Sequence, residues 1–279
     1  MENADELRRT IEQIANEAQT VALAVAVRDY ETGSEFKLNA ERSFHAASTI
    51  KVAVLLALFR ALDQGKLQLD DPLHVRNRFF SAADGKPFKL DSESDGYPQL
   101  YKSVGRTAKI GELADVMITS SSNLATNLLL DFITVEYARD VLREAGVSGI
   151  ELKRGVADDD AYAAGLNNET TAQGMIDLFG TLRGEFLSKT SREAVIAILL
   201  RQRFDSMLPA KLPSHATAAH KTGEISTACH DCGIVYVPER QPYVVAILTE
   251  VKTDADHRRA TVAKISKAIF DAVVGEPPV

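Results

Sequence analysis

The stretch Ser48-Thr-Ile-Lys-Val-Ala-Val-Leu-Leu-Ala-Leu-Phe-Arg-Ala-Leu62 decides how this chain folds. From residue 49 to residue 62 it is apolar on every side of a helix, apart from Lys51 and Arg60. A helix of that kind must be buried within the protein. Ser48 and Lys51 are three positions apart, which places them on one face, one turn apart. The stretch therefore predicts a hydroxyl and an amine side by side where a buried helix begins.

The remaining pattern predicts strands near both ends of the chain and helices between them. Helices are expected at 7–18, 49–62, 110–120, 123–132, 136–145, 172–183, 192–200 and 256–274, and strands at 21–27, 34–38, 233–237 and 242–250. Residues 74–109 are rich in Gly, Asp, Ser and Pro, which predicts a long surface excursion.

This order of elements predicts an α/β fold in the broad sense, an α+β sandwich. An antiparallel sheet flanked by the terminal helices would carry an inserted all-α lobe. We expect a discontinuous α/β domain over 1–43 and 212–279, and an all-α domain over 44–211. The active site is expected at their interface.

The composition excludes several classes of function. The 279 residues are 45% hydrophobic and 25% charged, which are ordinary values for a globular protein. The 32 Lys and Arg residues against 39 Asp and Glu residues give a net charge of −7. An acidic surface argues against a nucleic-acid partner. The most apolar run, 52–59, is far shorter than the roughly 20 residues that span a membrane, so no membrane segment is expected.

The N-terminal residues lack the basic and then apolar regions of a secretion signal. The chain as written is expected in the cytoplasm, and in the periplasm or outside the cell if a leader has been removed. We expect a monomer whose partner is a small-molecule substrate.

The chain's two cysteines are Cys229 and Cys232, in Cys-His-Asp-Cys. The spacing fits zinc or a redox pair. However, no second ligand pair completes a tetrahedral site, and the motif runs into a predicted strand, where positions three apart point to opposite faces. Two buried free thiols are the preferred interpretation.

Three short motifs suggest chemistry, although each has a simpler explanation by itself. A serine becomes a nucleophile when a desolvated lysine takes its proton, but Ser48 and Lys51 also fit a capping serine and a lysine that reaches solvent. Ser121 and Asn123 fit either a proton relay with an amide that binds substrate or a helix cap. Lys221-Thr222-Gly223 fits an edge strand that binds a carboxylate, or an ordinary turn.

Taken together and in this order, the three motifs resemble those of the serine β-lactamase and penicillin-binding protein superfamily, and most closely its class A branch. Similar stretches at 44–51, 117–130 and 219–223 extend the resemblance over nearly the whole chain. The resemblance implies an antiparallel sheet with terminal helices and an all-α lobe, which agrees with the predicted elements. It implies no cofactor and no metal.

The resemblance also implies roles for individual residues. Ser48 would be the acylated nucleophile and Lys51 its activating partner, while Ser121 would shuttle the proton. Asn123 would bind the substrate amide.

The third motif would bind the substrate's carboxylate. Lys221 and Thr222 would hold it, and Gly223 would let a ligand approach the backbone. The oxyanion would be held by the backbone N–H groups of Ser48 and Glu224.

The chain departs from the class A pattern in the loop that hydrolyses the acyl-enzyme. Arg154 and Glu169 mark the ends of such a loop, and we expect them to form an ion pair. The catalytic glutamate should stand two residues after the arginine, but Val156 stands there. Asp158 and Asp160 are candidates for a relocated base, while a solvated acidic loop is the preferred alternative.

Further departures lie in and near the substrate-binding motifs. Ser122 stands where class A has aspartate, and the Glu224 carboxylate is expected to repel an anionic β-lactam. Cys232 stands where an arginine often binds the substrate carboxylate, and His230 beside it is a candidate polar contact. A Ser-His-Asp triad is not expected, because neighbours such as His230 and Asp231 diverge on a strand.

The sequence therefore predicts a class A β-lactamase-like serine hydrolase that acts through an acyl-enzyme on β-lactams or related amides and esters. Without a base, deacylation would be slower by a factor of ~10²–10⁴. Two alternatives stay open: a penicillin-binding acyl transferase of the D-Ala-peptidase kind, and a non-catalytic sensor of β-lactams or peptides. Antibiotic resistance and β-lactam breakdown are the processes implied.

Overall fold

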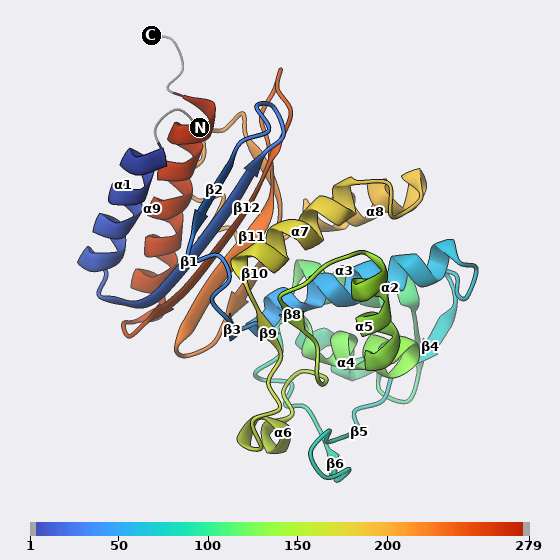
Figure 1. The fold of residues 1–279 in the computed structure, drawn as a ribbon. Coiled ribbons are helices and arrows are strands. Elements are labelled where there is room, and N and C mark those ends of the chain that lie inside the picture. The colour runs from blue at the N-terminus through green and yellow to red at the C-terminus, as the bar shows by residue number, and fades with distance from the viewer. Residues whose placement is uncertain (1–3, 276–279) are drawn as a thin grey trace. The chain divides into compact units, whose positions relative to one another are not determined.

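The computed structural model describes residues 4–275 and divides the chain into two compact units. Unit 1 consists of Met1–Thr49, Thr170–Gly180 and Phe204–Val279, and unit 2 of Ile50–Glu169 and Thr181–Arg203. Figure 1 shows the elements of both units, coloured along the chain.

Unit 1 contains a five-stranded sheet in the order β10-β11-β12-β1-β2, built from both ends of the chain. Every neighbouring pair is antiparallel, as the sequence predicts. The strands are β1 (Thr20–Asp29), β2 (Glu35–Leu38), β10 (Thr217–Glu224), β11 (Ala228–Tyr236) and β12 (Tyr243–Val251). The two-residue strand β3 (Phe44–His45) also belongs to this unit. Strand β10 lies at the edge of the sheet.

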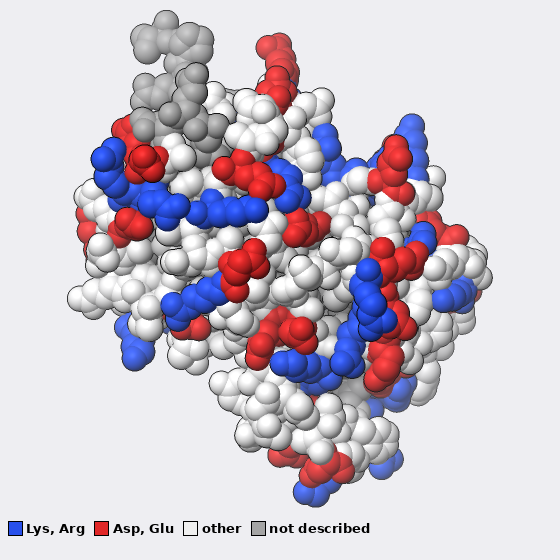
Figure 2. Space-filling view, viewed as in Figure 1, with Lys and Arg blue, Asp and Glu red and all other residues white. Residues whose placement is uncertain are grey.

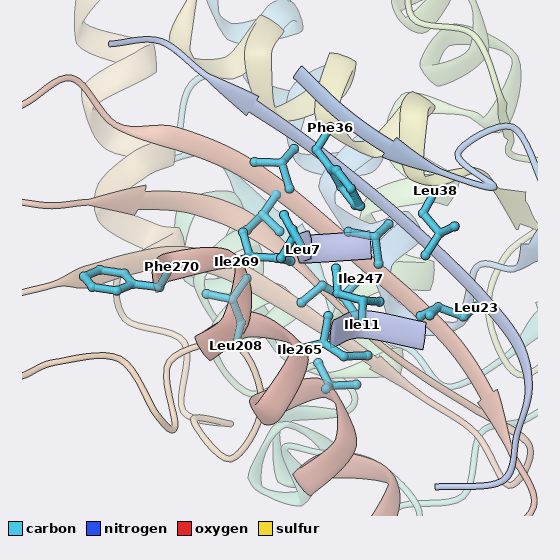
Figure 3. Close-up of a cluster of buried hydrophobic side chains, with 14 of the residues drawn as sticks. Leu7, Ile11, Leu23, Phe36, Leu38, Leu208, Ile247, Ile265, Ile269 and Phe270 are labelled. Carbon is cyan, nitrogen blue, oxygen red and sulfur yellow. The ribbon is translucent and has the colours of Figure 1, made fainter. Parts of the chain in front are cut away.

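The two terminal helices, α1 (Ala4–Glu17) and α9 (Ala255–Val274), lie side by side along one face of the sheet (Figure 1). Between helices and sheet lies a buried apolar cluster (Figure 3). Leu7 and Ile11 come from α1, Ile265 and Ile269 from α9, and Ile247 from β12. Each such side chain contributes about 1.5–3 kcal/mol when it is fully buried. This cluster holds the sheet that carries Lys221-Thr222-Gly223.

Helix α7 (Ala172–Arg183) begins in unit 1. Within that unit, Asp177 of α7 forms an ion pair of 2.9 Å with Arg28 of β1. The pair adds a polar contact between this helix and the sheet.

Unit 2 is mainly helical. Its helices are α2 (Lys51–Asp63), α3 (Ile110–Thr119), α4 (Asn123–Ile133), α5 (Val135–Glu144), α6 (Asp159–Ala163) and α8 (Lys189–Leu199). Two short strand pairs accompany them: β4 (Pro72–His74) with β7 (Thr107–Lys109), and β5 (Phe79–Phe80) with β6 (Pro87–Phe88). Strand β8 (Ile150–Glu151) belongs to the unit, and β9 (Glu169–Thr170) lies where unit 2 gives way to unit 1.

Helix α2 is buried along nearly its whole length. Every residue from Lys51 to Phe59 is shielded from solvent, and so is Ala61. Its backbone continues from the 3₁₀ turn η1 (Ala47–Ile50), which contains Ser48. The buried helix predicted from the apolar run is therefore confirmed.

The long excursion at 74–109 is less superficial than the sequence predicts. Besides the short strands it contains the 3₁₀ segment η2 (Pro98–Ser103). Ser81, Leu90, Asp95 and Leu100 within it are buried. Turn-rich composition indicates irregular backbone, but it does not reveal which polar residues find buried partners.

Charge and helix length give two further observations. Figure 2 shows Lys and Arg interspersed with Asp and Glu over the face drawn, as the balanced composition suggests. Among residues 4–275, no helix has the length and apolar character needed to cross a membrane.

Candidate active site

Ser48 lies in unit 1, in a turn whose backbone is fixed from several sides. Thr49 donates to the carbonyl of Ala46 through its N–H at 3.1 Å and through its hydroxyl at 2.6 Å. The N–H of Ala47 donates to Nδ1 of His45 at 3.0 Å. Ala47 adopts a left-handed φ of 47°, which non-glycine residues rarely do. The half-buried Ser48 therefore stands on a tightly constrained backbone.

Gly223 packs directly against that turn. A Cβ at this position would lie 2.9 Å from Cγ2 of Thr49, 3.1 Å from its backbone nitrogen and 3.2 Å from the carbonyl oxygen of Ala46. Any other side chain would displace one of the two segments. The glycine thus brings edge strand β10 against the residues that flank Ser48, both within unit 1.

Lys221 is buried on β10, and its Nζ donates to the carbonyl of Thr222 at 2.9 Å. Burial lowers its pKa to about 7, and the negative charge of Asp231 opposes the shift. An ammonium that has already lost its water shell can bind an anionic group without a further desolvation cost.

The side chain of Glu224 is engaged by two arginines of α9. Its carboxylate lies 3.2 Å from Nη2 of Arg258 and 2.9 Å from Arg259. We expected this carboxylate to repel an anionic substrate. The two guanidinium groups balance the charge of this carboxylate, which weakens the expected repulsion.

His230 on β11 is fully buried, and both ring nitrogens are used within unit 1. Nε2 lies 3.0 Å from the carbonyl oxygen of His45, and the N–H of Thr249 donates to Nδ1 at 3.1 Å. Burial lowers the pKa of His230 to about 4, which favours the neutral ring. This geometry corrects the expected polar contact: His230 supports the Ser48 segment instead of facing a substrate.

Asp231, the next residue, pairs with a different histidine. Its carboxylate lies 2.9 Å from Nδ1 of His220 and accepts the N–H of Leu208 at 3.0 Å. Asp231 and His230 thus have separate partners, as expected for neighbours on a strand.

The two cysteines are buried free thiols, which confirms the preferred interpretation. Burial raises the pKa of Cys229 to about 12 and that of Cys232 well above its ordinary value. Both groups are therefore protonated and unreactive. Within residues 4–275, no group of three or more His, Cys, Asp or Glu side chains is placed to hold a metal ion.

In unit 2, Lys51 of the first motif meets Ser121 and Asn123 of the second. Lys51 is buried, and its Nζ donates to the carbonyl oxygen of Ser121 at 2.7 Å, to the Ser121 hydroxyl at 3.1 Å and to Oδ1 of Asn123 at 2.8 Å. Ser121 and Asn123, which lie 70 and 72 positions after Lys51 in the sequence, thus accept hydrogen bonds from the same amine. A lysine among eight apolar neighbours is explained, because three protein oxygens surround its Nζ and offset the loss of water.

Local backbone geometry positions these partners. Ser121 adopts a left-handed φ of 57° between α3 and α4. Ser122 caps α4, since its hydroxyl accepts the N–H of Ala125 at 3.2 Å. The capping interpretation of this motif is correct for Ser122. Ser121 and Asn123 direct oxygens at Lys51.

The loop that begins at Arg154 is held by other contacts than the expected ion pair with Glu169. Arg154 donates to the carbonyl oxygens of Leu166 at 2.7 Å and Gly155 at 2.9 Å. Glu169 lies 3.6 Å from Nζ of Lys153 instead. The expected Arg154–Glu169 ion pair is therefore wrong: the arginine closes the loop through backbone carbonyls.

Val156 is buried, and Asn127 of α4 anchors it. The Asn127 side chain accepts the N–H of Val156 at 2.8 Å and donates to its carbonyl at 2.9 Å. Asn127 does not belong to any of the three motifs and was not predicted from the sequence. Its spacing of four from Asn123, on the same face of α4, is the signal that was available.

Asp158 and Asp160 occupy different environments. The buried Asp158 accepts the Ser81 hydroxyl at 2.8 Å and the N–H groups of Ala82 at 2.8 Å and Ala161 at 3.1 Å, which caps α6. Asp160 is exposed in the first turn of α6. The geometry therefore favours a structural role for Asp158 and a solvated one for Asp160.

Comparison with known proteins decides the family. A family model described as the beta-lactamase enzyme family matches residues 6–273. The chain belongs to the beta-lactamase enzyme family. A beta-lactamase from Bacteroides uniformis is 22% identical over 285 residues, covering 96% of this chain and 91% of the relative. The predicted family and the predicted enzyme class, a serine hydrolase, are confirmed.

Solved structures within and near the beta-lactamase enzyme family share the fold. An ancestral class A beta-lactamase (GNCA) is 27% identical with a TM-score of 0.83, covering 95% of this chain and 99% of that one. A mutant of PBP-A, solved as its acyl-enzyme complex with penicillin G, is 26% identical with a TM-score of 0.81, covering 96% of each. The predicted fold class is confirmed.

Proposed function

We propose that this member of the beta-lactamase enzyme family is acylated on Ser48 by β-lactams and releases the acyl group slowly. The observation that carries the proposal is the set of hydrogen bonds from Lys51 Nζ to Ser121 and Asn123. The relatives named beta-lactamase and the penicillin G complex of PBP-A support β-lactams as the substrate class.

Each step of acylation has a group to carry it. Lys51, one helical turn after Ser48 along the chain, acts in its neutral amine form and accepts the serine proton as the hydroxyl attacks the lactam carbonyl. The backbone N–H groups of Ser48 and Glu224 hold the resulting oxyanion. When the C–N bond breaks, Ser121 gives its hydroxyl proton to the lactam nitrogen and receives the proton that Lys51 took from Ser48, which returns Lys51 to the neutral amine. The product is an ester on Ser48 with the ring opened.

The remaining motif residues bind the substrate. Asn123 receives the side-chain amide, while Lys221 and Thr222 hold the carboxylate. Gly223 keeps β10 close to the Ser48 turn, so that the oxyanion donors stand on two packed segments.

Deacylation needs a base that activates water. Val156 has no ionisable side chain, the Asp158 carboxylate is occupied by three donors, and Asp160 is solvated. We infer that neither aspartate is the base and that the ester persists. Loss of a general base slows such a step by roughly 10²–10⁴-fold.

The test combines turnover with intact mass. The protein is incubated with a chromogenic cephalosporin, and colour and mass are followed together for wild type and Ser48→Ala. We expect a persistent adduct with slow colour release in wild type and neither signal in the variant. Fast turnover without an adduct would refute slow deacylation, and equal signals in both proteins would refute the serine mechanism.

A further inference from the structure

A buried carboxylate that the motifs do not include lies against the start of α4. Asp95 belongs to the segment between β6 and η2 and is 5% exposed. Its Oδ2 accepts the backbone N–H of Asn123 at 3.0 Å and that of Leu124 at 2.9 Å. These N–H groups belong to the first turn of the helix, where no intrahelical acceptor exists for them. One carboxylate oxygen thus fixes the backbone of a motif residue.

The carboxylate is itself held in position. Oδ1 of Asp95 accepts the N–H of Tyr97 at 2.8 Å, and the Tyr101 hydroxyl donates to Oδ2 at 3.0 Å. Burial and the charge of Asp95 raise the pKa of Tyr101 well above its ordinary value, so its hydroxyl remains a donor. Asp95 therefore receives four hydrogen bonds, two of which come from the nearby residues Tyr97 and Tyr101.

The backbone beside Asp95 touches the same loop. A Cβ on Gly96 would lie 1.8 Å from the carbonyl oxygen of Ser120. Only a glycine permits this approach. The Asp95-Gly96 pair therefore clamps the segment on both sides of Ser121, which itself holds a left-handed backbone at a cost of about 1–2 kcal/mol.

Asn123 connects this clamp to Lys51, because it accepts a hydrogen bond from Lys51 and donates one to Asp95. Asn123 receives Asp95 on its backbone N–H and Lys51 on its side-chain Oδ1, at 3.0 and 2.8 Å. Ser121 receives Lys51 on its carbonyl at 2.7 Å. A shift of the first turn of α4 and of the residues just before it would move both residues that accept hydrogen bonds from the amine. All these residues belong to unit 2.

We propose that Asp95 is a positioning residue for acylation: by holding the first turn of α4, it keeps Ser121 and Asn123 where they orient Lys51. The mechanistic part of this inference rests on the proposed function, while the structural part does not. Misplacing reacting groups by about 1 Å is enough to slow a reaction on the order of 10²-fold.

Two substitutions separate the effects of Asp95. Asp95→Ala removes every acceptor. Asp95→Asn keeps an amide oxygen for Asn123 and Leu124 and directs its NH₂ at the N–H of Tyr97, so the clamp is weakened but retained. Asp91→Asn is the matched control, because Asp91 is exposed on the same segment and its side chain accepts the N–H of Glu93, a contact in which Asp95 is not involved. Its backbone carbonyl accepts from Ser94 and Tyr101, and the substitution leaves that carbonyl in place.

Hydrogen exchange tests the structural part without any substrate. Exchange of the backbone amides of 121–125 is measured by mass spectrometry in wild type and the three variants. We expect faster exchange in Asp95→Ala, an intermediate rate in Asp95→Asn and the wild-type rate in Asp91→Asn. Unchanged exchange in Asp95→Ala would overturn the inference, whatever the enzyme's activity.

Acylation kinetics test the mechanistic part. The acylation rate constant and the non-covalent dissociation constant for penicillin G are measured separately, with the melting temperature as a check on folding. We expect the rate constant to fall about 100-fold in Asp95→Ala and less in Asp95→Asn, at nearly unchanged dissociation constant. Faster exchange with an unchanged rate constant would overturn the positioning role. Failure of wild type to acylate would refute the proposed function and leave exchange to decide the clamp.

Discussion

Nζ of Lys51 lies 2.8 Å from Oδ1 of Asn123, although the two residues are 72 positions apart. Lys51 begins α2 and Asn123 begins α4, so the contact joins the first turns of two buried helices. A lysine in a core needs oxygen partners to offset its desolvation. The same contact that makes the buried amine tolerable thus also places it beside the Ser121 hydroxyl.

Removing that amine should slow acylation strongly. Lys51→Ala is expected to lower the acylation rate constant by about 10²–10⁴-fold, the usual contribution of a general base. Stopped-flow measurement with a chromogenic cephalosporin gives the rate. Lys66→Ala, an exposed lysine just beyond the end of α2, is the control. Wild-type acylation in Lys51→Ala would exclude the lysine as the activating base.

The contact between β10 and the Ser48 turn predicts a second outcome. Gly223→Ala places a Cβ 2.9 Å from Cγ2 of Thr49. We expect a loss of about 1–3 kcal/mol in the free energy of unfolding, as for other overpacked sites, and slower acylation. Denaturant unfolding measures the first effect and stopped-flow the second.

Thr49→Ser supplies the control for this contact. It removes Cγ2 and keeps the hydroxyl that donates to Ala46. The double variant Gly223→Ala, Thr49→Ser should recover part of the stability and rate that Gly223→Ala loses. Purely additive effects would show that Cγ2 of Thr49 does not obstruct the added Cβ.

Because we infer that no side chain acts as the base for deacylation, introducing one should speed that step. The resemblance places the catalytic glutamate at Val156, so Val156→Glu should accelerate deacylation, by as much as ~10²–10⁴-fold if the carboxylate reaches the ester. The lifetime of the adduct, followed by intact mass, reports this step. Val156→Gln has the same shape and no base. Equal lifetimes in the two variants would mean that position 156 does not face the ester.

Burial of Lys221 predicts how stability depends on pH. Its pKa is lowered to about 7 in the folded protein from 10.5. Between these values the unfolded chain binds more protons, so the free energy of unfolding should rise with pH, by at most about 1.4 kcal/mol per pH unit. Below pH 7 the lysine is protonated in both the folded and the unfolded state, so its contribution to the slope disappears there.

Denaturant unfolding from pH 6 to 10 measures this slope. Lys221→Met should remove it, whereas Lys264→Met, at an exposed position of α9, should leave it unchanged. The same slope in wild type and Lys221→Met would show that another group causes the pH dependence.

The sequence predicted most of the regular elements, for identifiable reasons, but left the segment of β10 open between an edge strand and a turn. The all-apolar run after Ser48 can only be a buried helix, and the β-branched runs at both ends can only complete one sheet. Strand β11 was predicted too short, because Cys229, His230 and Asp231 look polar, although each is buried. Partners far along the chain satisfy these groups, and local pattern cannot reveal them.

The site shows the same limit. The motifs selected Lys51, Ser121 and Asn123 because their spacing is characteristic. Asp95 and Asn127 act through backbone groups of residues that are 28 and 29 positions away. Only the folded structure reveals such contacts. The same holds for Glu224, whose charge is balanced by two arginines of the last helix.

The most direct test of the central claim locates the acyl group. After incubation with penicillin G, the protein is digested with trypsin, and the peptide 43–51 is sequenced by mass spectrometry. This peptide contains Ser43, Ser48 and Thr49 as possible acceptors. We predict that the mass of penicillin G is found on Ser48 alone and is absent from the Ser48→Ala variant. A label on another residue, or one that persists in Ser48→Ala, would contradict the account.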